Sequence, residues 1–263
     1  MTRFLSGLAL ALGALALVWW LTSTQLLVVA LAVAALAFFE YARLARAVGA
    51  LLPALPALIA LVATLAACAA VVTPWLHLPS VLALGLVAIA VALLASGQHG
   101  AGLFHGATAG MLAPVYLGLP LGALAGIHQL AGREGVLMVM ATVAASDTCQ
   151  YYSGRAFGRR PLAPVVSPKK TIEGAIGGLV LAPVVLVLIA QAWLPGRSPF
   201  AVWLAGLGIV VAGIAGDLFK SVLKRAAGVK DSGTLIPGHG GVLDRIDALL
   251  FAAPLFYLLV RVA

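Results

Sequence analysis

Long apolar runs fill this chain and constrain its fold more than any other feature of the sequence. Successive runs of about 16–24 apolar residues are separated by short polar segments, and such runs can cross a hydrocarbon core of ~30 Å as α-helices. Hydrophobic residues make up 63% of the chain and the mean hydropathy is +1.13, whereas soluble domains are about 45–50% apolar. We therefore expect an all-α polytopic membrane protein, with residues 1–263 forming a single transmembrane domain.

The apolar runs divide into nine predicted transmembrane helices. The fifth is the weakest because Pro114, Gly118 and Pro120 interrupt it, although membrane helices tolerate such breaks where neighbours satisfy the freed backbone groups. The predicted spans cover roughly residues 4–21, 25–40, 51–73, 79–96, 108–127, 134–150, 172–194, 199–219 and 244–262.

Basic residues predict how these helices are oriented. An odd number of spans puts the termini on opposite sides, and a cytoplasmic N-terminus places 13 of the 16 Lys and Arg residues on inner segments. The positive-inside rule therefore favours a cytoplasmic N-terminus and an external C-terminus in the cell (inner, or cytoplasmic) membrane. The inner basic residues are Arg3, Arg43, Arg46, Arg155, Arg159, Arg160, Lys169, Lys170, Lys220, Lys224, Arg225, Lys230 and Arg245.

The net charge of +8 could also suit a nucleic-acid-binding protein. Such proteins present a basic soluble face, often with aromatic residues that stack on bases. The sequence has neither feature in a polar context, so we exclude nucleic acid as a partner.

Acidic residues gather on the predicted cytoplasmic side. Asp147, Asp217 and Asp247 lie within or at the ends of apolar spans, where an ionised group is costly unless it is paired. We expect a polar pocket that faces the cytoplasm and dips into the membrane. A transporter would place its binding groups near the bilayer midplane, so gathering at one face favours an enzyme.

The end of the eighth span brings charged and polar residues onto one face. Lys220, Ser221 and Lys224 follow Asp217 at i+3, i+4 and i+7, so all four share one side of a helix. An intrahelical pair between Asp217 and Lys220 or Ser221 could simply end the span. The next helix favours a different interpretation.

The ninth span begins with two more carboxylates. Asp244 and Asp247 are three residues apart and therefore point the same way on a helix. With Asp217 they give three carboxylates from adjoining helices, which suit Mg²⁺ because it prefers oxygen ligands and often binds together with substrate phosphates. We predict a magnesium site at Asp217, Asp244 and Asp247, with a second cation as an option.

A glycine-rich turn precedes the ninth span. Its sequence is Pro237-Gly238-His239-Gly240-Gly241. Glycine permits positive φ and close backbone approach, so such a turn can direct N–H groups at phosphate oxygens just ahead of a helix. His239 lies between a basic helix face and acids of the kind that bind metals. We therefore favour a functional role for His239 over that of an ordinary turn residue.

The loop at 151–171 adds a second basic segment. Ser167 followed by Pro168 predicts the N-cap and the first residue of a helix. Lys169 and Lys170 would then place mobile charge at a helix N-terminus, a favourable position for a phosphate chain. Lysines that only set the membrane orientation are the alternative. Asp147, upstream, is either a polar pocket residue or a helix-end carboxylate.

These segments combine into one long motif, which comprises Ser221-Val222-Leu223-Lys224-Arg225, Lys230-Asp231-Ser232-Gly233, Pro237-Gly238-His239-Gly240-Gly241 and Asp244-Arg245-Ile246-Asp247. The motif resembles the signature of the phosphatidate cytidylyltransferases, also called CDP-diacylglycerol synthases. Gly216-Asp217-Leu218 and the segment 167–174 are similar to further family motifs, so the motif-bearing part covers about residues 147–247. The family often has Ala at the position of Gln150.

The resemblance implies that CTP and phosphatidate give CDP-diacylglycerol and pyrophosphate, at a site facing the cytoplasm. It also implies Mg²⁺ at the three aspartates and a homodimer in the lipid bilayer. The residues assigned to catalysis are Asp217, Ser221, Lys224, Arg225, His239, Asp244, Arg245 and Asp247. Those assigned to substrate binding are Ser167, Lys169, Lys170, Thr171, Lys230, Asp231, Gly238, Gly240 and Gly241.

Two alternatives stay open. The first is an enzyme that uses CTP on another lipid, either a lipid kinase or a cytidylyltransferase for a different lipid phosphate. The second, less favoured, is a transporter whose buried charges line an ion pathway.

Overall fold

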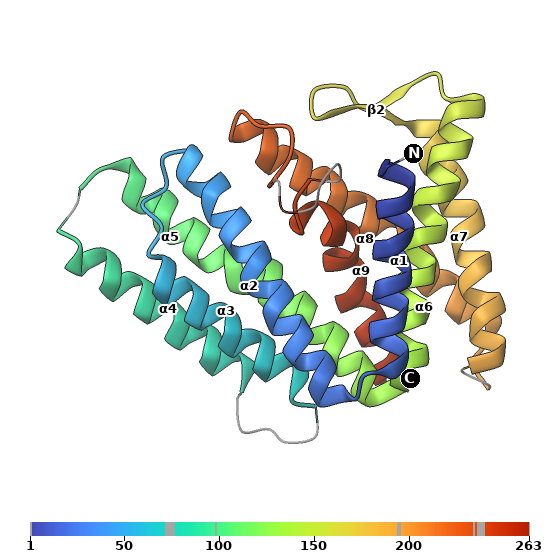
Figure 1. Ribbon diagram of the computed structural model, residues 1–263, viewed down its shortest axis with the longest axis horizontal. Coiled ribbons are helices and arrows are strands. Elements are labelled where there is room, and N and C mark those ends of the chain that lie inside the picture. The colour runs from blue at the N-terminus through green and yellow to red at the C-terminus, as the bar shows by residue number, and fades with distance from the viewer. Residues whose placement is uncertain are drawn as a thin grey trace. The chain divides into compact units, whose positions relative to one another are not determined.

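The computed structural model is almost entirely helical (Figure 1). It describes residues 2–71, 77–97, 99–193, 196–233, 235 and 240–262. Besides helices, the described residues form one π-helical segment and one antiparallel hairpin. In chain order the elements are α1 (Thr2–Trp20), α2 (Ser23–Ala47), α3 (Ala54–Ala69), α4 (Leu78–Ala95), α5 (Ala101–Ala113), η1 (Pro114–Gly118), α6 (Leu119–Phe157), β1 (Pro161–Ala163), β2 (Ser167–Thr171), α7 (Ile172–Trp193), α8 (Pro199–Ala226) and α9 (Leu243–Val262).

The chain divides into two compact units, and neither is continuous in sequence. The first unit consists of Met1–Gln129 and Leu223–Arg245, and the second of Leu130–Val222 and Ile246–Ala263. The helices α6, α8 and α9 therefore each contribute residues to both units.

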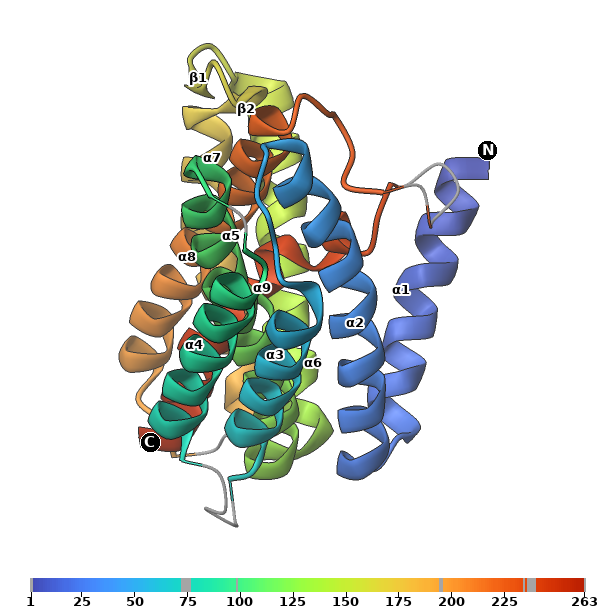
Figure 2. The ribbon, with the colours of Figure 1, turned by 90° about the vertical axis from the view of Figure 1, so that its left-hand side faces the viewer.

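In the first unit, α2, α3, α4 and α5 pack beside one another, and η1 lies against α3 (Figure 2). Glycines permit this close packing. A Cβ on Gly118 would lie 2.7 Å from the carbonyl oxygen of Leu61, and one on Gly85 would lie 2.9 Å from the Cβ of Ala60. Small residues at helix contacts are typical of membrane proteins, where van der Waals packing drives helix association.

The second unit contains the hairpin and the packing of α7 against α6. A Cβ on Gly174 would lie 2.7 Å from the carbonyl oxygen of Gln150, so only glycine allows this approach. The hairpin pairs β1 with β2 and leads directly into α7. Figure 1 shows α6 and α7 alongside each other, with β2 at their end.

Helix length and composition support a multi-pass membrane protein. In the described part of the chain, five helical segments are long and apolar enough to cross a bilayer. The nine-span count and the predicted orientation stay predictions. The five segments are Ser23–Ala47, Leu78–Ala95, Ala101–Phe157, Ile172–Trp193 and Pro199–Ala226, and shorter apolar helices cover Ala11–Trp20 and Ala54–Ala69.

The predicted fifth and sixth spans lie in one long helical stretch, Ala101–Phe157. The gap predicted between them contains Gly132, whose φ of 66° and ψ of −169° are not helical. A positive φ is accessible to glycine without strain, so the chain kinks here. The helix then continues to Phe157, seven residues beyond the predicted end at Gln150.

The predicted N-cap at Ser167 is wrong. Ser167 begins β2 and pairs with Ala163 in the hairpin, and α7 starts five residues later at Ile172. Thr171 provides the helix-end contact instead, because its Oγ1 accepts a hydrogen bond from the Gly174 amide at 3.1 Å. The Ser-Pro pair suggested a helix start, but strand pairing determined the local structure.

Candidate active site

Four charged side chains in the second unit form a continuous ionic network, which we call the Lys220 cluster: Lys170, Asp217, Lys220 and Asp247. Lys170 Nζ lies 2.5 Å from one carboxylate oxygen of Asp217, and Lys220 Nζ lies 2.9 Å from the other. Lys220 also pairs with Asp247. Lys220 and Asp247 are 6% and 8% exposed, so these charges are compensated away from solvent.

The Lys220 cluster draws on three elements that are far apart in sequence. Lys170 comes from β2, Asp217 and Lys220 from α8, and Asp247 from α9. Contact between α8 and α9 depends on Gly216, since a Cβ there would lie 2.5 Å from the carbonyl oxygen of Asp247. The predicted i, i+3 pair of Asp217 and Lys220 is confirmed, but it belongs to a larger network and does not merely end the helix.

A second polar cluster lies in the first unit, and we call it the Asp244 cluster: Glu40, Lys224, Ser232, Gly241 and Asp244. Lys224 Nζ lies 2.6 Å from Asp244 Oδ1. Asp244 Oδ2 accepts hydrogen bonds from the amides of Ser232 at 2.9 Å and Gly241 at 3.2 Å. The Asp244 carboxylate is therefore fixed by both a side chain and the backbone.

Glu40 supports this cluster and is a residue that the sequence analysis did not select. It is 6% exposed, near the end of α2. Its carboxylate accepts hydrogen bonds from the Val242 amide at 2.9 Å and the Leu243 amide at 3.0 Å, and lies 2.8 Å from Ser232 Oγ. A carboxylate at the start of α9 satisfies amides that have no partner within the helix.

Lys220 was the other omission, since the sequence analysis treated it as a neighbour of Asp217 and not as a site residue. The useful signal for both residues was a charged side chain at the end of a predicted apolar helix. Glu40 ends the predicted second span, and Lys220 directly follows the eighth.

Glycines shape the Asp244 cluster. Gly240 has a φ of 80°, which matches the predicted glycine turn. A Cβ on Gly240 would lie 2.8 Å from Asp244 Oδ2, and one on Gly241 would overlap the Glu40 carboxylate. Gly233 packs in the same way, with a Cβ there 2.6 Å from Glu40 Oε1. Pro237, Gly238 and His239 lie outside the described residues, so their predicted roles stay predictions.

The other predicted site residues differ in their exposure to solvent. Arg225 donates to the Val229 carbonyl oxygen at 3.3 Å. Lys169 on β2 and Arg245 on α9 are exposed, and so are Lys230 and Asp231, while Ser221 on α8 is half-buried. Their predicted roles in binding and catalysis stay predictions.

The position of Asp147 decides between its two interpretations. It lies ten residues before the end of α6, so a helix-end carboxylate is wrong. It shares a narrow cavity of the second unit with Ser146, Gly213 and Ala248. Asp147 is therefore an exposed residue in the body of α6 that borders this cavity.

The donor chemistry of the Lys220 cluster fits a hard cation. Within the described ranges, no group of three or more His, Cys, Asp or Glu side chains is close enough to bind a metal ion. Asp217 and Asp247 nevertheless converge on one ammonium group. Two carboxylates that already share the ammonium group of Lys220 have the charge and the oxygen ligands that Mg²⁺ prefers.

Comparison with known proteins gives related sequences over about half of the chain. The chain is 41% identical over 139 residues to the phosphatidate cytidylyltransferase of Helicobacter pylori, covering 53% of this chain and 52% of that protein. It is 48% identical over 125 residues to the enzyme of that name from Haemophilus influenzae, covering 46% and 43%. The uncharacterized protein YnbB of Escherichia coli is 45% identical over 126 residues, covering 48% and 42%.

In these alignments the chain spans about half the length of the curated relatives it matches. A match to the model of one protein family extends further and covers residues 1–263. Because that match includes every element of the fold and both ionic clusters, the chain belongs to the cytidylyltransferase family.

Proposed function

We propose that this protein is a phosphatidate cytidylyltransferase, which converts CTP and phosphatidate to CDP-diacylglycerol and pyrophosphate for phospholipid synthesis. Membership of the cytidylyltransferase family carries the proposal. The names of two related proteins support phosphatidate as the lipid. The paired lysines and aspartates of β2, α8 and α9 supply charges of both signs, which a metal-phosphate reaction requires.

The proposed reaction is a displacement at the α-phosphorus of CTP. A phosphatidate oxygen forms a bond to this phosphorus, and the bond from it to the bridging oxygen of the β-phosphate breaks. Pyrophosphate leaves with that electron pair. The nucleophile is already anionic, so the reaction needs no strong base. It requires charge neutralisation and in-line placement of the two substrates.

Lysines of the two clusters are suited to this task. Lys170 and Lys224 each pair with an aspartate in the protein without substrate. In our proposal they exchange this contact for oxygens of the phosphates, and Arg225, Arg245 and His239 orient them. The backbone amide of Gly240 adds a hydrogen bond of the kind that glycine turns offer to phosphates, while the Gly241 amide holds the Asp244 carboxylate.

We propose Asp217, Asp244 and Asp247 as the ligands of Mg²⁺, as their helical spacing in the motif suggests. The bound ion would neutralise charge on the triphosphate oxygens. Lys220, which joins Asp217 to Asp247, would keep the two carboxylates aligned. A homodimer and a second cation are also part of the proposal, on family similarity alone.

The reaction is tested with protein solubilised in detergent. We expect release of pyrophosphate from CTP only when phosphatidate and a divalent cation are both present. Full turnover in excess EDTA would contradict the metal role. Turnover of diacylglycerol, with CDP and phosphatidate as products, would identify the lipid kinase instead, and substrate flux without pyrophosphate release would identify a carrier.

We also propose that the site faces the cytoplasm from the inner membrane. The test uses single cysteines in a background where Cys68 and Cys149 are replaced by Ala. In intact cells, a cysteine placed within 155–166 should be protected from a membrane-impermeant thiol reagent, while one at 196–198 should react. Labelling of the 155–166 segment from outside would separate Lys170 from cytoplasmic CTP and defeat the proposed orientation.

A further inference from the structure

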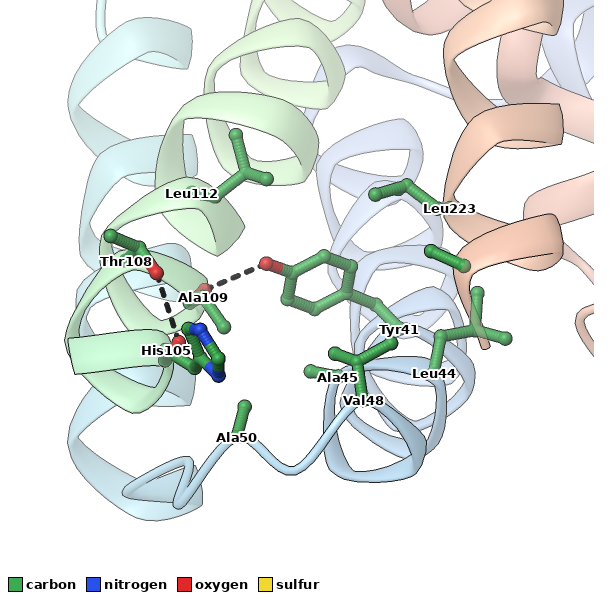
Figure 3. A pocket seen from close by; sticks show the side chains of 11 residues that line it. Tyr41, Leu44, Ala45, Val48, Ala50, His105, Thr108, Ala109, Leu112 and Leu223 are labelled. Carbon is green, nitrogen blue, oxygen red and sulfur yellow. Dashed lines mark hydrogen bonds between the residues drawn. The ribbon is translucent and has the colours of Figure 1, made fainter. Parts of the chain in front are cut away.

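An apolar cavity of about 310 Å³ lies among α2, α5 and the end of α8 in the first unit. This volume lies within the usual range of about 300–1,000 Å³ for small-molecule sites. Figure 3 shows its lining side chains facing one another across the opening. They include Tyr41, Leu44, Val48, Thr108, Leu112 and Leu223.

The two hydroxyl groups of this lining are already satisfied within the fold, and the His105 imidazole is the other polar side chain there. The Tyr41 hydroxyl donates to the Ala109 carbonyl oxygen at 2.8 Å. Thr108 Oγ1 lies 3.0 Å from the carbonyl oxygens of Phe104 and His105. The cavity therefore presents mainly hydrocarbon, which suits an alkyl chain and not a nucleotide or a charged headgroup.

The cavity and the Asp244 cluster share the same two helices. On α2, Glu40 binds the turn before α9, and the next residue, Tyr41, lines the cavity. On α8, Lys224 pairs with Asp244, and the preceding residue, Leu223, lines the cavity. Adjacent helical residues are separated by about 100° around a cylinder ~10–12 Å wide. The charged cluster and the cavity therefore occupy neighbouring faces.

We propose that this cavity binds one acyl chain of the glycerolipid substrate while the lipid phosphate lies at the Asp244 cluster. The inference rests on the proposed function, because it assigns the second substrate of that reaction to a place in the fold. The polar and apolar faces lie next to each other around α2 and α8. This arrangement matches an amphiphile with an anionic head and an apolar tail.

The kinetic test narrows the cavity with Thr108→Phe at an exposed position of α5. The KM for dioleoyl phosphatidate in mixed micelles should rise about tenfold, a typical penalty for a mismatch in an apolar pocket. The KM for CTP and the KM for dihexanoyl phosphatidate should not change. Ala101→Phe is the control: it adds the same bulk to α5 away from the lining and should resemble wild type.

Two kinetic outcomes would overturn the proposal. One is an unchanged KM for dioleoyl phosphatidate in a Thr108→Phe protein that elutes and melts like wild type. The other is an equal rise for the short-chain and long-chain lipids, since that would place the effect outside a chain-binding cavity.

A binding measurement separates this inference from the reaction itself. Phosphatidate with a diazirine at the end of one acyl chain should label the α5 segment containing Leu112, and unlabelled phosphatidate should compete. The label is read by mass spectrometry and needs no turnover. Label on α5 in a protein without pyrophosphate release would refute the proposed function and keep the cavity assignment. Label confined to other helices would refute the cavity assignment.

Discussion

The Lys220 cluster and the Asp244 cluster contain similar residues but are held in different ways. In the Lys220 cluster, ammonium groups link side chains of β2, α8 and α9. In the Asp244 cluster, backbone amides bind the carboxylates of Asp244 and Glu40. An ammonium group can be exchanged for a metal ion or a phosphate contact, whereas a backbone amide is part of the fold. The first cluster is therefore held by contacts that ligands can replace, whereas in the second the backbone fixes the carboxylates and Lys224 supplies the replaceable contact.

Neutralising one aspartate in each cluster should have the largest effect. We expect Asp217→Asn and Asp244→Asn each to lower kcat by roughly a hundredfold or more, as for loss of a charge contact in phosphoryl transfer. The midpoint of thermal unfolding should fall further in Asp244→Asn than in Asp217→Asn. Of these two aspartates, Asp244 is the one that accepts hydrogen bonds from backbone amides of the turn. Turnover within about threefold of wild type, at unchanged expression, would make these acids structural.

Glu40→Ala tests whether the Asp244 cluster depends on its buried support. Removing the carboxylate leaves the Val242 and Leu243 amides without this acceptor, which should cost about 1–3 kcal/mol for each buried group left unsatisfied. A lower midpoint of thermal unfolding and a lower kcat should appear together. Glu40→Gln is the matched control, since it retains one acceptor oxygen and should lose less. A Glu40→Ala protein with the wild-type midpoint would show that the turn is held by other contacts.

Gly241→Ala tests the contact between Glu40 and the turn by a change in the turn itself. The added Cβ would overlap the Glu40 carboxylate, and overpacking of this kind typically costs about 1–3 kcal/mol. We expect a lower unfolding midpoint and a higher KM for CTP. Gly13→Ala is the control, because no atom lies within 4 Å of the added Cβ. Equal midpoints for the two variants would mean that the Glu40 side chain moves aside freely.

The helix-end contact of Thr171 should give the smallest effect. Thr171→Val removes the oxygen that accepts from the Gly174 amide, and loss of such a cap costs about 1 kcal/mol. Thr171→Ser keeps the hydroxyl and should retain wild-type stability. If Thr171 acts only through this contact, the KM for CTP stays constant in Thr171→Val. An increase in that KM at unchanged stability would instead support the predicted substrate-binding role.

Sequence patterns predicted the helical class and most helix positions because hydrophobic length is a strong signal. The predicted span 172–194 corresponds to α7 at Ile172–Trp193, and 244–262 corresponds to α9 at Leu243–Val262. The predictions failed where pairing with a second segment decides the structure. The β1–β2 hairpin placed Ser167 in a strand, and no local feature of its Ser-Pro pair indicates that partner.

The contacts of the candidate site were also predicted only in part. Helical spacing placed Asp217 beside Lys220, since both lie on one helix. It gave no indication that Lys170 would contact Asp217, because that contact depends on how the hairpin folds back. Glu40 was equally hidden, since its partners follow it by about 200 residues.

The long separation between Glu40 and its partners has a consequence for biogenesis. Leu243 follows Glu40 by 203 residues, which at about 5–20 residues per second corresponds to roughly 10–40 s of translation. During this interval α2 is already made, while the amides that receive its carboxylate do not yet exist. An ionised group within a membrane helix is costly without partners. The free energy therefore favours keeping the Glu40 end of α2 near the aqueous interface until α9 is made. Synthesis of α9 is thus the step that completes the contacts of Glu40 in the Asp244 cluster.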